Sequence, residues 1–201
     1  VMNFGSYWFS DKIVLALYGA KEISREANPQ LHLMVEELAR EAHIPKPKIC
    51  LVALPVPNAF ATGRNEKHAV VAVTNGILEL LNEDELRGVL AHELSHIKNR
   101  DILISSIAAT LAGAISYIAQ MAYFAGMLGG RSSDDSRGGG NAFGTIALLM
   151  LTPLIATLLH LAISRSREYL ADETGSQISK NPKSLASALK KLHQSSRVHP
   201  L

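Results

Sequence analysis

One stretch decides how the rest of the chain is arranged, and it reads Leu90-Ala-His92-Glu93-Leu-Ser-His96-Ile-Lys-Asn-Arg100. Asn82 and Glu85 precede it at the spacing of a capping box, so the sequence predicts a helix that begins just after Asn82. Residues four apart lie one above the other on a helix, and His92 and His96 therefore share one face. This spacing predicts that the imidazoles of His92 and His96 bind one metal ion.

Glu93 lies one position round the helix from His92 and completes an H-E-x-x-H motif. A divalent ion held by three protein groups keeps an open position for water and lowers the pKa of that water. Glu93 is then the catalytic base, which takes a proton as the water attacks a peptide carbonyl and passes it to the leaving amine. The alternative is a helix that carries two histidines by chance, so the interpretation needs a third metal ligand.

Two long apolar stretches follow this helix. Ile102 to Gly130 contains no charged residue over 29 positions, and Asn141 to Ser164 contains no Asp, Glu, Lys or Arg over 24 positions. At about 1.5 Å per residue, each helix would be long enough to cross a hydrocarbon core of roughly 30 Å. We therefore expect residues 102–164 to form a membrane-spanning helical hairpin with a flexible loop at 129–141. The alternative is a pair of core helices in a larger soluble protein.

The hairpin returns the chain to the side of the membrane from which it left, and there the sequence offers a third ligand. Glu168 and Asp172 are four residues apart on a helix-compatible segment, so they share a face. We predict that Glu168 completes a catalytic Zn²⁺ site, one per chain, and that Asp172 orients a ligating imidazole. Two histidines and one carboxylate also bind cobalt, manganese or iron, so zinc is the first expectation among several metals. Taken alone, the segment would be a charged helix face whose Arg165 and Arg167 reach lipid headgroups.

The first half of the chain predicts the elements that surround the metal helix. Apolar spacing predicts helices over 11–24 and from Pro29 to Pro45, and a short helix over 77–81. Residues 49–54 and 69–74 are rich in β-branched side chains and predict strands, with a third strand over 58–63. An exposed edge of this small sheet would bind an extended peptide, although the pattern alone favours an ordinary hairpin for 58–63. A final amphipathic helix is expected after Asn181.

Composition excludes several classes of protein. The 201 residues carry a formal net charge of +2, which is no large basic field, so we expect no nucleic-acid partner. Cys50 is the only cysteine, which excludes a disulfide framework within one chain. The sequence begins at Val1 without a leader pattern, and we expect a fragment whose upstream part is missing. The oligomeric state is not indicated.

Three motifs in order resemble a known family. The H-E-x-x-H helix with Asn99-Arg-Asp101, the apolar hairpin with Ser164-Arg-Ser-Arg-Glu168-Tyr-Leu-Ala-Asp172, and Asn58-Ala-Phe-Ala-Thr-Gly63 resemble the HtpX-type membrane zinc metallopeptidases, distant relatives of the CAAX-prenyl endopeptidases. The resemblance implies zinc on His92, His96 and Glu168, with Glu93 as base and Asp172 in support. It also implies that Asn58, Ala59 and Phe60 belong to the substrate-binding edge. Such proteins have further N-terminal spans and continue past Leu201.

These observations together predict a mainly α fold with a small β-sheet, a zincin-like catalytic unit with an inserted hydrophobic hairpin. We expect residues 1–101 and 165–201 to form the catalytic domain and 102–164 the hairpin. Positive residues gather at the catalytic ends of the hairpin, which predicts an integral protein of a bacterial or archaeal plasma membrane whose site faces the cytoplasm. The expected function is a zinc endopeptidase that cleaves misfolded or unassembled membrane proteins. The alternatives are a membrane scaffold with a structural metal and a soluble metallopeptidase with buried apolar helices.

Overall fold

The computed structural model describes residues 15–129 and 139–198, and it divides into two compact units. The first unit comprises residues 1–103 and 167–201, and the second comprises residues 104–166. The fold is mainly helical with one small mixed sheet, which confirms the predicted fold class.

Four strands form the sheet of the first unit, in the order β1-β2-β4-β3. The strands are β1 (Lys21–Glu22), β2 (Lys48–Val52), β3 (Ala59–Thr62) and β4 (Val70–Thr74), and η1 (Glu66–His68) is a 3-10 turn between the last two. β2 pairs in parallel with β4, whereas β3 pairs antiparallel with β4 and β1 pairs antiparallel with β2. The third predicted strand is therefore both part of a hairpin and an edge of the sheet.

The predicted helix over 11–24 is wrong at its C-terminal end. Residues 15–17 are helical, but Gly19 has φ +59, and the chain then enters β1. The Ile23 amide donates to the Ile49 carbonyl, and Lys21 pairs with Leu51. The backbone of residues 21–23 therefore forms hydrogen bonds with β2 instead of continuing a helix. Helical spacing of apolar residues could not reveal this pairing, because it depends on a strand far along the chain. Residues 1–14 lie outside the described part.

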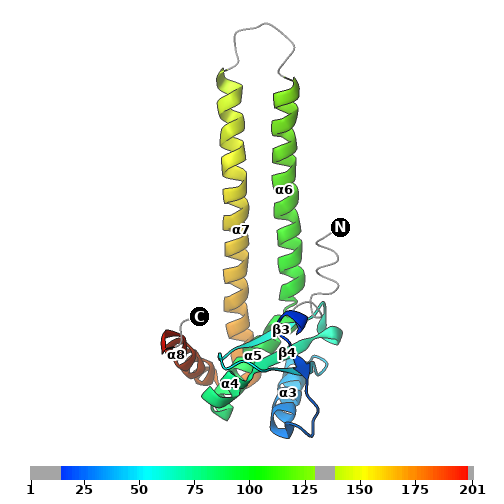
Figure 1. Ribbon diagram of the computed structural model, residues 1–201, viewed down its shortest axis with the longest axis vertical. Coiled ribbons are helices and arrows are strands. Elements are labelled where there is room, and N and C mark those ends of the chain that lie inside the picture. The colour runs from blue at the N-terminus through cyan, green and yellow to red at the C-terminus, as the bar shows by residue number, and fades with distance from the viewer. Residues whose placement is uncertain (1–14, 130–138, 199–201) are drawn as a thin grey trace. The chain divides into compact units, whose positions relative to one another are not determined.

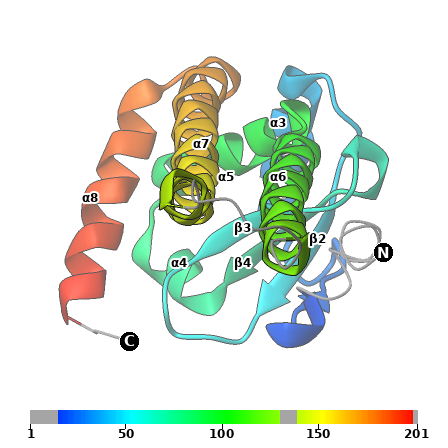
Figure 2. The same cartoon turned by 90° about the horizontal axis from the view of Figure 1, so that it is seen from above.

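Two helices cover one face of the sheet (Figure 2). α3 (Pro29–Ala42) begins at Asn28, whose Oδ1 accepts from the Leu31 amide, and it buries one apolar face. α5 (Glu83–Lys98) is the predicted metal helix, and α4 (Asn75–Leu80) leads into it. Their shared core includes Leu31, Val35, Leu38, Ile49, Val71, Val73, Ile77, Leu90 and Leu94. This core fixes α5 beside β3, which places the H-E-x-x-H motif next to a sheet edge.

Three further helices complete the described chain (Figure 1). They are α6 (Asp101–Gly129), α7 (Gly139–Ser179) and α8 (Pro182–Val198). In α6 the window Asp101–Ile118 is long and apolar enough to cross a membrane by length and composition, and 6% of it is buried. The second expected span falls within α7, where the side chains of 141–150 lie outside the described set, as does most of the expected loop.

Candidate active site

The metal helix α5 is fixed at its N-terminus by a reciprocal cap. The Glu85 amide donates to Asn82 Oδ1 at 2.9 Å, and the Asn82 amide donates to Glu85 Oε2 at 3.0 Å. At the other end Arg100 adopts φ 55, which ends α5 and lets α6 begin at Asp101. The helix therefore presents His92 and His96 from a rigid element whose opposite face is buried in the core.

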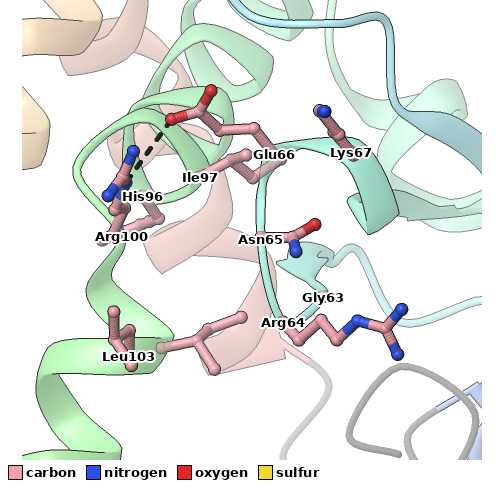
Figure 3. A pocket seen from close by; sticks show the side chains of 10 residues that line it. Gly63, Arg64, Asn65, Glu66, Lys67, His96, Ile97, Arg100 and Leu103 are labelled. Carbon is pink, nitrogen blue, oxygen red and sulfur yellow. Dashed lines mark ion pairs between the residues drawn. The ribbon is translucent and has the colours of Figure 1, made fainter. Parts of the chain in front are cut away.

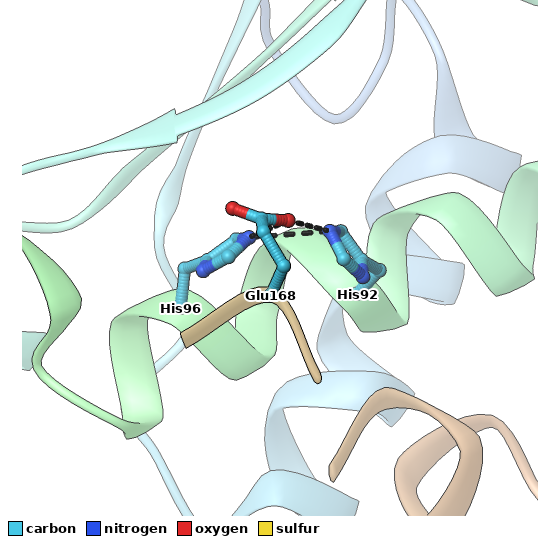
Figure 4. A group of neighbouring side chains, drawn as sticks. All are labelled: His92, His96 and Glu168. Carbon is cyan, nitrogen blue, oxygen red and sulfur yellow. Dashed lines mark hydrogen bonds and ion pairs between the residues drawn. The ribbon is translucent and has the colours of Figure 1, made fainter. Parts of the chain in front are cut away.

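Three potential metal ligands converge from α5 and α7, as Figure 4 shows. His92 Nε2 lies 3.2 Å from His96 Nε2 and 3.6 Å from Glu168 Oε2, and His96 Nε2 lies 4.0 Å from the same oxygen. A tetrahedral ion with bonds of about 2.0–2.2 Å separates its ligands by about 3.3–3.6 Å, so two of these distances are near those of a zinc site and the one from His96 to Glu168 is longer. The structure thus brings together the three residues predicted as ligands, although 76 positions separate His92 from Glu168 in the sequence.

Each imidazole has a carboxylate behind it. His92 Nδ1 lies 2.9 Å from Asp172 Oδ1, and His96 Nδ1 lies 2.6 Å from Asp101 Oδ2. The contact with Asp172 has the length of a hydrogen bond but lacks its alignment. His92 Nδ1 is therefore a buried nitrogen without an aligned hydrogen-bond partner. Such partners fix the ring orientation and leave Nε2 for the metal. The structure places Asp172 beside His92, the imidazole that it was expected to orient, and it places Asp101 beside His96, a contact that the sequence analysis missed.

Asp101 is itself held by Arg167 from α7. Arg167 Nε donates to Asp101 Oδ1 at 2.6 Å, its Nη2 donates to the same oxygen, and Nη2 also donates to the Asn99 carbonyl at 2.7 Å. The side chains of Arg167 and Asp101 are only 18% and 10% exposed. Arg167 therefore belongs to a chain of contacts that ends at His96, and it does not have the free guanidinium expected of a headgroup anchor. No spacing rule pairs residues 66 positions apart, so the sequence held no signal for this contact.

Glu93 lies against the edge strand. Its Oε2 accepts a hydrogen bond of 3.0 Å from the Ala61 amide of β3. Burial raises the pKa of Glu93 to about 7, against the opposing effects of His96 and the Ala61 amide. Burial and the neighbouring His96 also lower the pKa of His92, which favours the neutral imidazole that metals bind. A carboxyl poised near neutrality beside two metal-binding imidazoles suits a general base.

The free edge of β3 can be deduced from its pairing with β4. The Thr74 amide donates to the Asn58 carbonyl, so the backbone N–H and C=O groups of Asn58 face β4. Hydrogen-bonded and non-hydrogen-bonded pairs alternate along an antiparallel ladder, so the backbone groups of Phe60 and Thr62 also face β4. The backbone groups of Ala59 and Ala61 then face the open side, and the bond from Ala61 to Glu93 agrees with this. Phe60 instead packs on the other face of the sheet, with its ring 5.2 Å from that of Tyr18.

A cavity of about 650 Å³ opens on the His92 side of the metal ligands. Asn58, Ala59, His92, Glu93 and Asp172 line it together with apolar residues from α4, α5 and α8, namely Ile77, Val89, Leu185, Leu189 and Leu192. Of the three residues predicted at the substrate edge, the structure thus places Asn58 and Ala59 in this cavity but not Phe60. The contribution of α8 to the cavity wall was missed, because an apolar helix face does not show which cavity its side chains will line.

Close packing brings α7 onto α5 behind the ligands. Ser95 Oγ donates to the Ala171 carbonyl at 2.9 Å, and Asn99 Nδ2 donates to Thr174 Oγ1 at 3.3 Å. A Cβ on Gly175 would lie 3.0 Å from the Cα and the amide nitrogen of His92, so a larger residue here would require the two helices to shift apart by a few tenths of an ångström. The fixed contact sets the position of Glu168 relative to the two histidines.

Comparisons with known proteins agree with this geometry. The profile of Peptidase family M48 matches residues 25–201. The chain is 60% identical over 193 residues to a protease HtpX homolog of Sulfurihydrogenibium sp., and 60% identical over 196 residues to one of Aquifex aeolicus, covering 96% of this chain and 65% of each relative. A protease HtpX homolog of Pyrococcus furiosus is 57% identical over 200 residues, covering 100% of this chain and 68% of the relative.

A solved structure shares the fold. The crystal structure of S. mikatae Ste24p aligns with a TM-score of 0.62 and 19% identity, covering 99% of this chain and 53% of that one. At this identity the likeness shows the fold alone. The chain spans 65% of the length of each of the first two relatives.

Proposed function

The chain belongs to peptidase family M48, and we propose that it forms the catalytic part of a membrane-bound zinc endopeptidase. The family confirms the resemblance found in the sequence. One observation carries the proposal: His92, His96 and Glu168 converge beside Glu93, and Glu93 in turn contacts the free edge of β3. Potential ligands, base and a strand for the substrate therefore lie beside one another.

His92, His96 and Glu168 would hold the zinc, with Asp172 and Asp101 orienting the two imidazoles. Bound zinc would supply Lewis-acid activation of water and of the scissile carbonyl. An extended peptide would pair with the outward backbone groups of Ala59 and with the Ala61 carbonyl, since a free strand edge binds a further strand by main-chain hydrogen bonds.

Glu93 would move the proton. The Ala61 amide holds Oε2, which leaves Oε1 to take the proton from the attacking water and to return it to the leaving amine. The apolar cavity beside His92 would accept a hydrophobic substrate side chain, because its walls are formed by Ile77, Val89 and the leucines of α8.

The proposal includes the membrane. The apolar window of α6 is 6% buried, and Ile107, Leu111, Ile115 and Ile118 on it are exposed, as lipid contact would require. Lys98 and Arg100 precede this window, which favours a catalytic side in the cytoplasm of a bacterial or archaeal cell. Misfolded or unassembled membrane proteins would then be the polypeptide substrates.

The test is cleavage of casein by the detergent-purified, zinc-loaded full-length protein. We expect Glu93→Gln to abolish cleavage while zinc content stays at one per chain, because Glu93 is not a ligand. Glu79→Gln, an exposed acid on α4, is the matched control and should cleave as the wild type does. Cleavage by Glu93→Gln at the wild-type rate would contradict the mechanism. Loss of the protein from carbonate-washed membranes would contradict the membrane assignment.

A membrane scaffold with a structural metal is the other candidate. Structural zinc sites are closed by four ligands, whereas the group that the described residues offer has three, with a cavity beside it. Bound zinc without cleavage of any unfolded protein would favour the scaffold.

A further inference from the structure

A second cavity, of about 320 Å³, lies on the His96 side of the metal ligands (Figure 3). The loop of residues 63–67, which follows β3 directly, forms one wall, and the end of α5 with His96 and Arg100 forms another. The first turn of α6 closes it with Ile102 and Leu103. The two cavities thus flank the three ligands, one beside each histidine.

The lining of this second cavity is positively charged. Three cations line it, Arg64, Lys67 and Arg100, against the single carboxylate of Glu66. Glu66 Oε1 lies 3.6 Å from Arg100 Nε. This ion pair, drawn in Figure 3, offsets one positive charge of the lining and leaves an excess of positive charge. Arg64 Nη2 lies 2.8 Å from His68 Nε2. The cavity beside His92 is lined mainly by apolar side chains, so the two cavities differ in chemistry.

Strand β3 and the loop of residues 63–67 that follows it connect the walls of the two cavities. β3 runs from Ala59, at the apolar cavity, to Thr62, and Gly63 then turns the chain with φ 131. A Cβ on Gly63 would lie 2.3 Å from the His68 carbonyl, so the turn is tight and its shape is fixed. A peptide that follows β3 past Glu93 therefore extends over the charged loop.

We propose that this cavity binds an acidic side chain of the substrate, Asp or Glu, on the His96 side of the scissile bond. The inference rests on the proposed peptidase function and adds a substrate preference to it. Arg100, Lys67 and Arg64 would provide charge-assisted hydrogen bonds to the carboxylate. A lipid headgroup phosphate would be recognised by the same groups, but the shared wall with His96 and the continuity with β3 favour the peptide.

The experiment uses the full-length, zinc-loaded protein in detergent and a series of internally quenched peptides. Each peptide has the same apolar residues at the cut site and one Glu, Gln or Lys placed in turn on either side of it. Mass spectrometry locates the cut, and kcat/KM is compared between the three residues. Exposed ion pairs are worth about 0.2–1 kcal/mol, so we expect Glu to be preferred over Gln by up to about fivefold, on one side only. Salt at about 0.5 M should weaken the preference.

Variants assign the preference to the cavity. The Glu-to-Gln ratio should fall towards one in the Lys67→Gln/Arg100→Gln double variant. Arg25→Gln is the matched control, because Arg25 is 61% exposed and lies 3.6 Å from Glu36, much as Arg100 is 67% exposed beside Glu66. This control should keep both the ratio and the activity.

The outcomes separate the two proposals. Equal cleavage of the Glu and Gln peptides, or a preference that survives the double variant, would overturn the acidic subsite while leaving the peptidase intact. A double variant whose activity falls only in anionic lipid vesicles, with an unchanged peptide preference, would make the cavity a headgroup site. If no peptide is cleaved, the proposed function fails together with the inference.

Discussion

Replacing Asp101 by Asn should weaken zinc binding without removing a ligand. Asp101 Oδ2 lies 2.6 Å from His96 Nδ1 and is only 10% exposed, so its charge acts on the imidazole with little screening by water. Removing such a partner typically costs 10- to 100-fold in metal affinity, or about 1.4–2.7 kcal/mol. An amide keeps the shape of the side chain, so the lost charge accounts for the change.

A second cost falls on Arg167. The Nη2 bond to the Asn99 carbonyl remains in the variant, but the bonds to Asp101 lose their charged acceptor. Hydrogen bonds to charged groups contribute about 1.5–3 kcal/mol, and with Arg167 18% exposed we expect about 1–2 kcal/mol of lost stability in the metal-free protein.

The assay is competition for zinc against a chelator of known affinity, with thermal unfolding of the chelated protein measured in parallel. Glu37→Gln is the control, because Glu37 pairs with Arg87 at 2.8 Å on α3 and α5, away from the ligands. It should leave the zinc affinity unchanged. A zinc affinity of Asp101→Asn within twofold of the wild type would refute the reasoning, whatever happens to stability.

Three further predictions follow from the same geometry. Gly175→Ala should destabilise the protein by about 1–3 kcal/mol and lower zinc affinity, because its Cβ would press on the backbone of His92; thermal unfolding and chelator competition would measure both, and an unchanged melting temperature would show that the helices can part freely. Hydrogen bonds from Lys191 and Ser187 of α8 lower the pKa of Glu85 from its ordinary value of 4.5 to about 2, so its contribution to stability is complete above pH 4.5 and is lost as the pH falls from there towards 2. Lys191→Gln should make acid unfolding less steep across that window, and an identical acid profile would contradict the assignment. In the chelated protein, ¹³C NMR should show Glu93 titrating near pH 7, and added zinc should lower this midpoint because the cation favours the carboxylate; a midpoint near 4.5 without metal would contradict the burial of this group.

Local rules accounted for most of the secondary structure. The cap at Asn82 and the spacing of His92 and His96 placed the metal helix correctly, since both depend on residues within two turns of each other. Proline and apolar spacing placed α3 and α8, and β-branched runs placed β2 and β4. The helix expected to reach Ser24 failed for the opposite reason, because pairing with β2 decided the backbone at Lys21 and Glu22.

The sequence by itself determined the donor set: two imidazoles on one helical face, a carboxyl group beside them at Glu93, and a further carboxyl group at Glu168. Only the tertiary structure decided what supports and shapes the site. It joined Asp101 to Arg167, put Ala61 rather than Phe60 against Glu93, and added α8 to the wall of the apolar cavity. These contacts link segments far apart in the chain through side chains whose types fit many partners. They are therefore selected by packing, which a one-dimensional pattern does not contain.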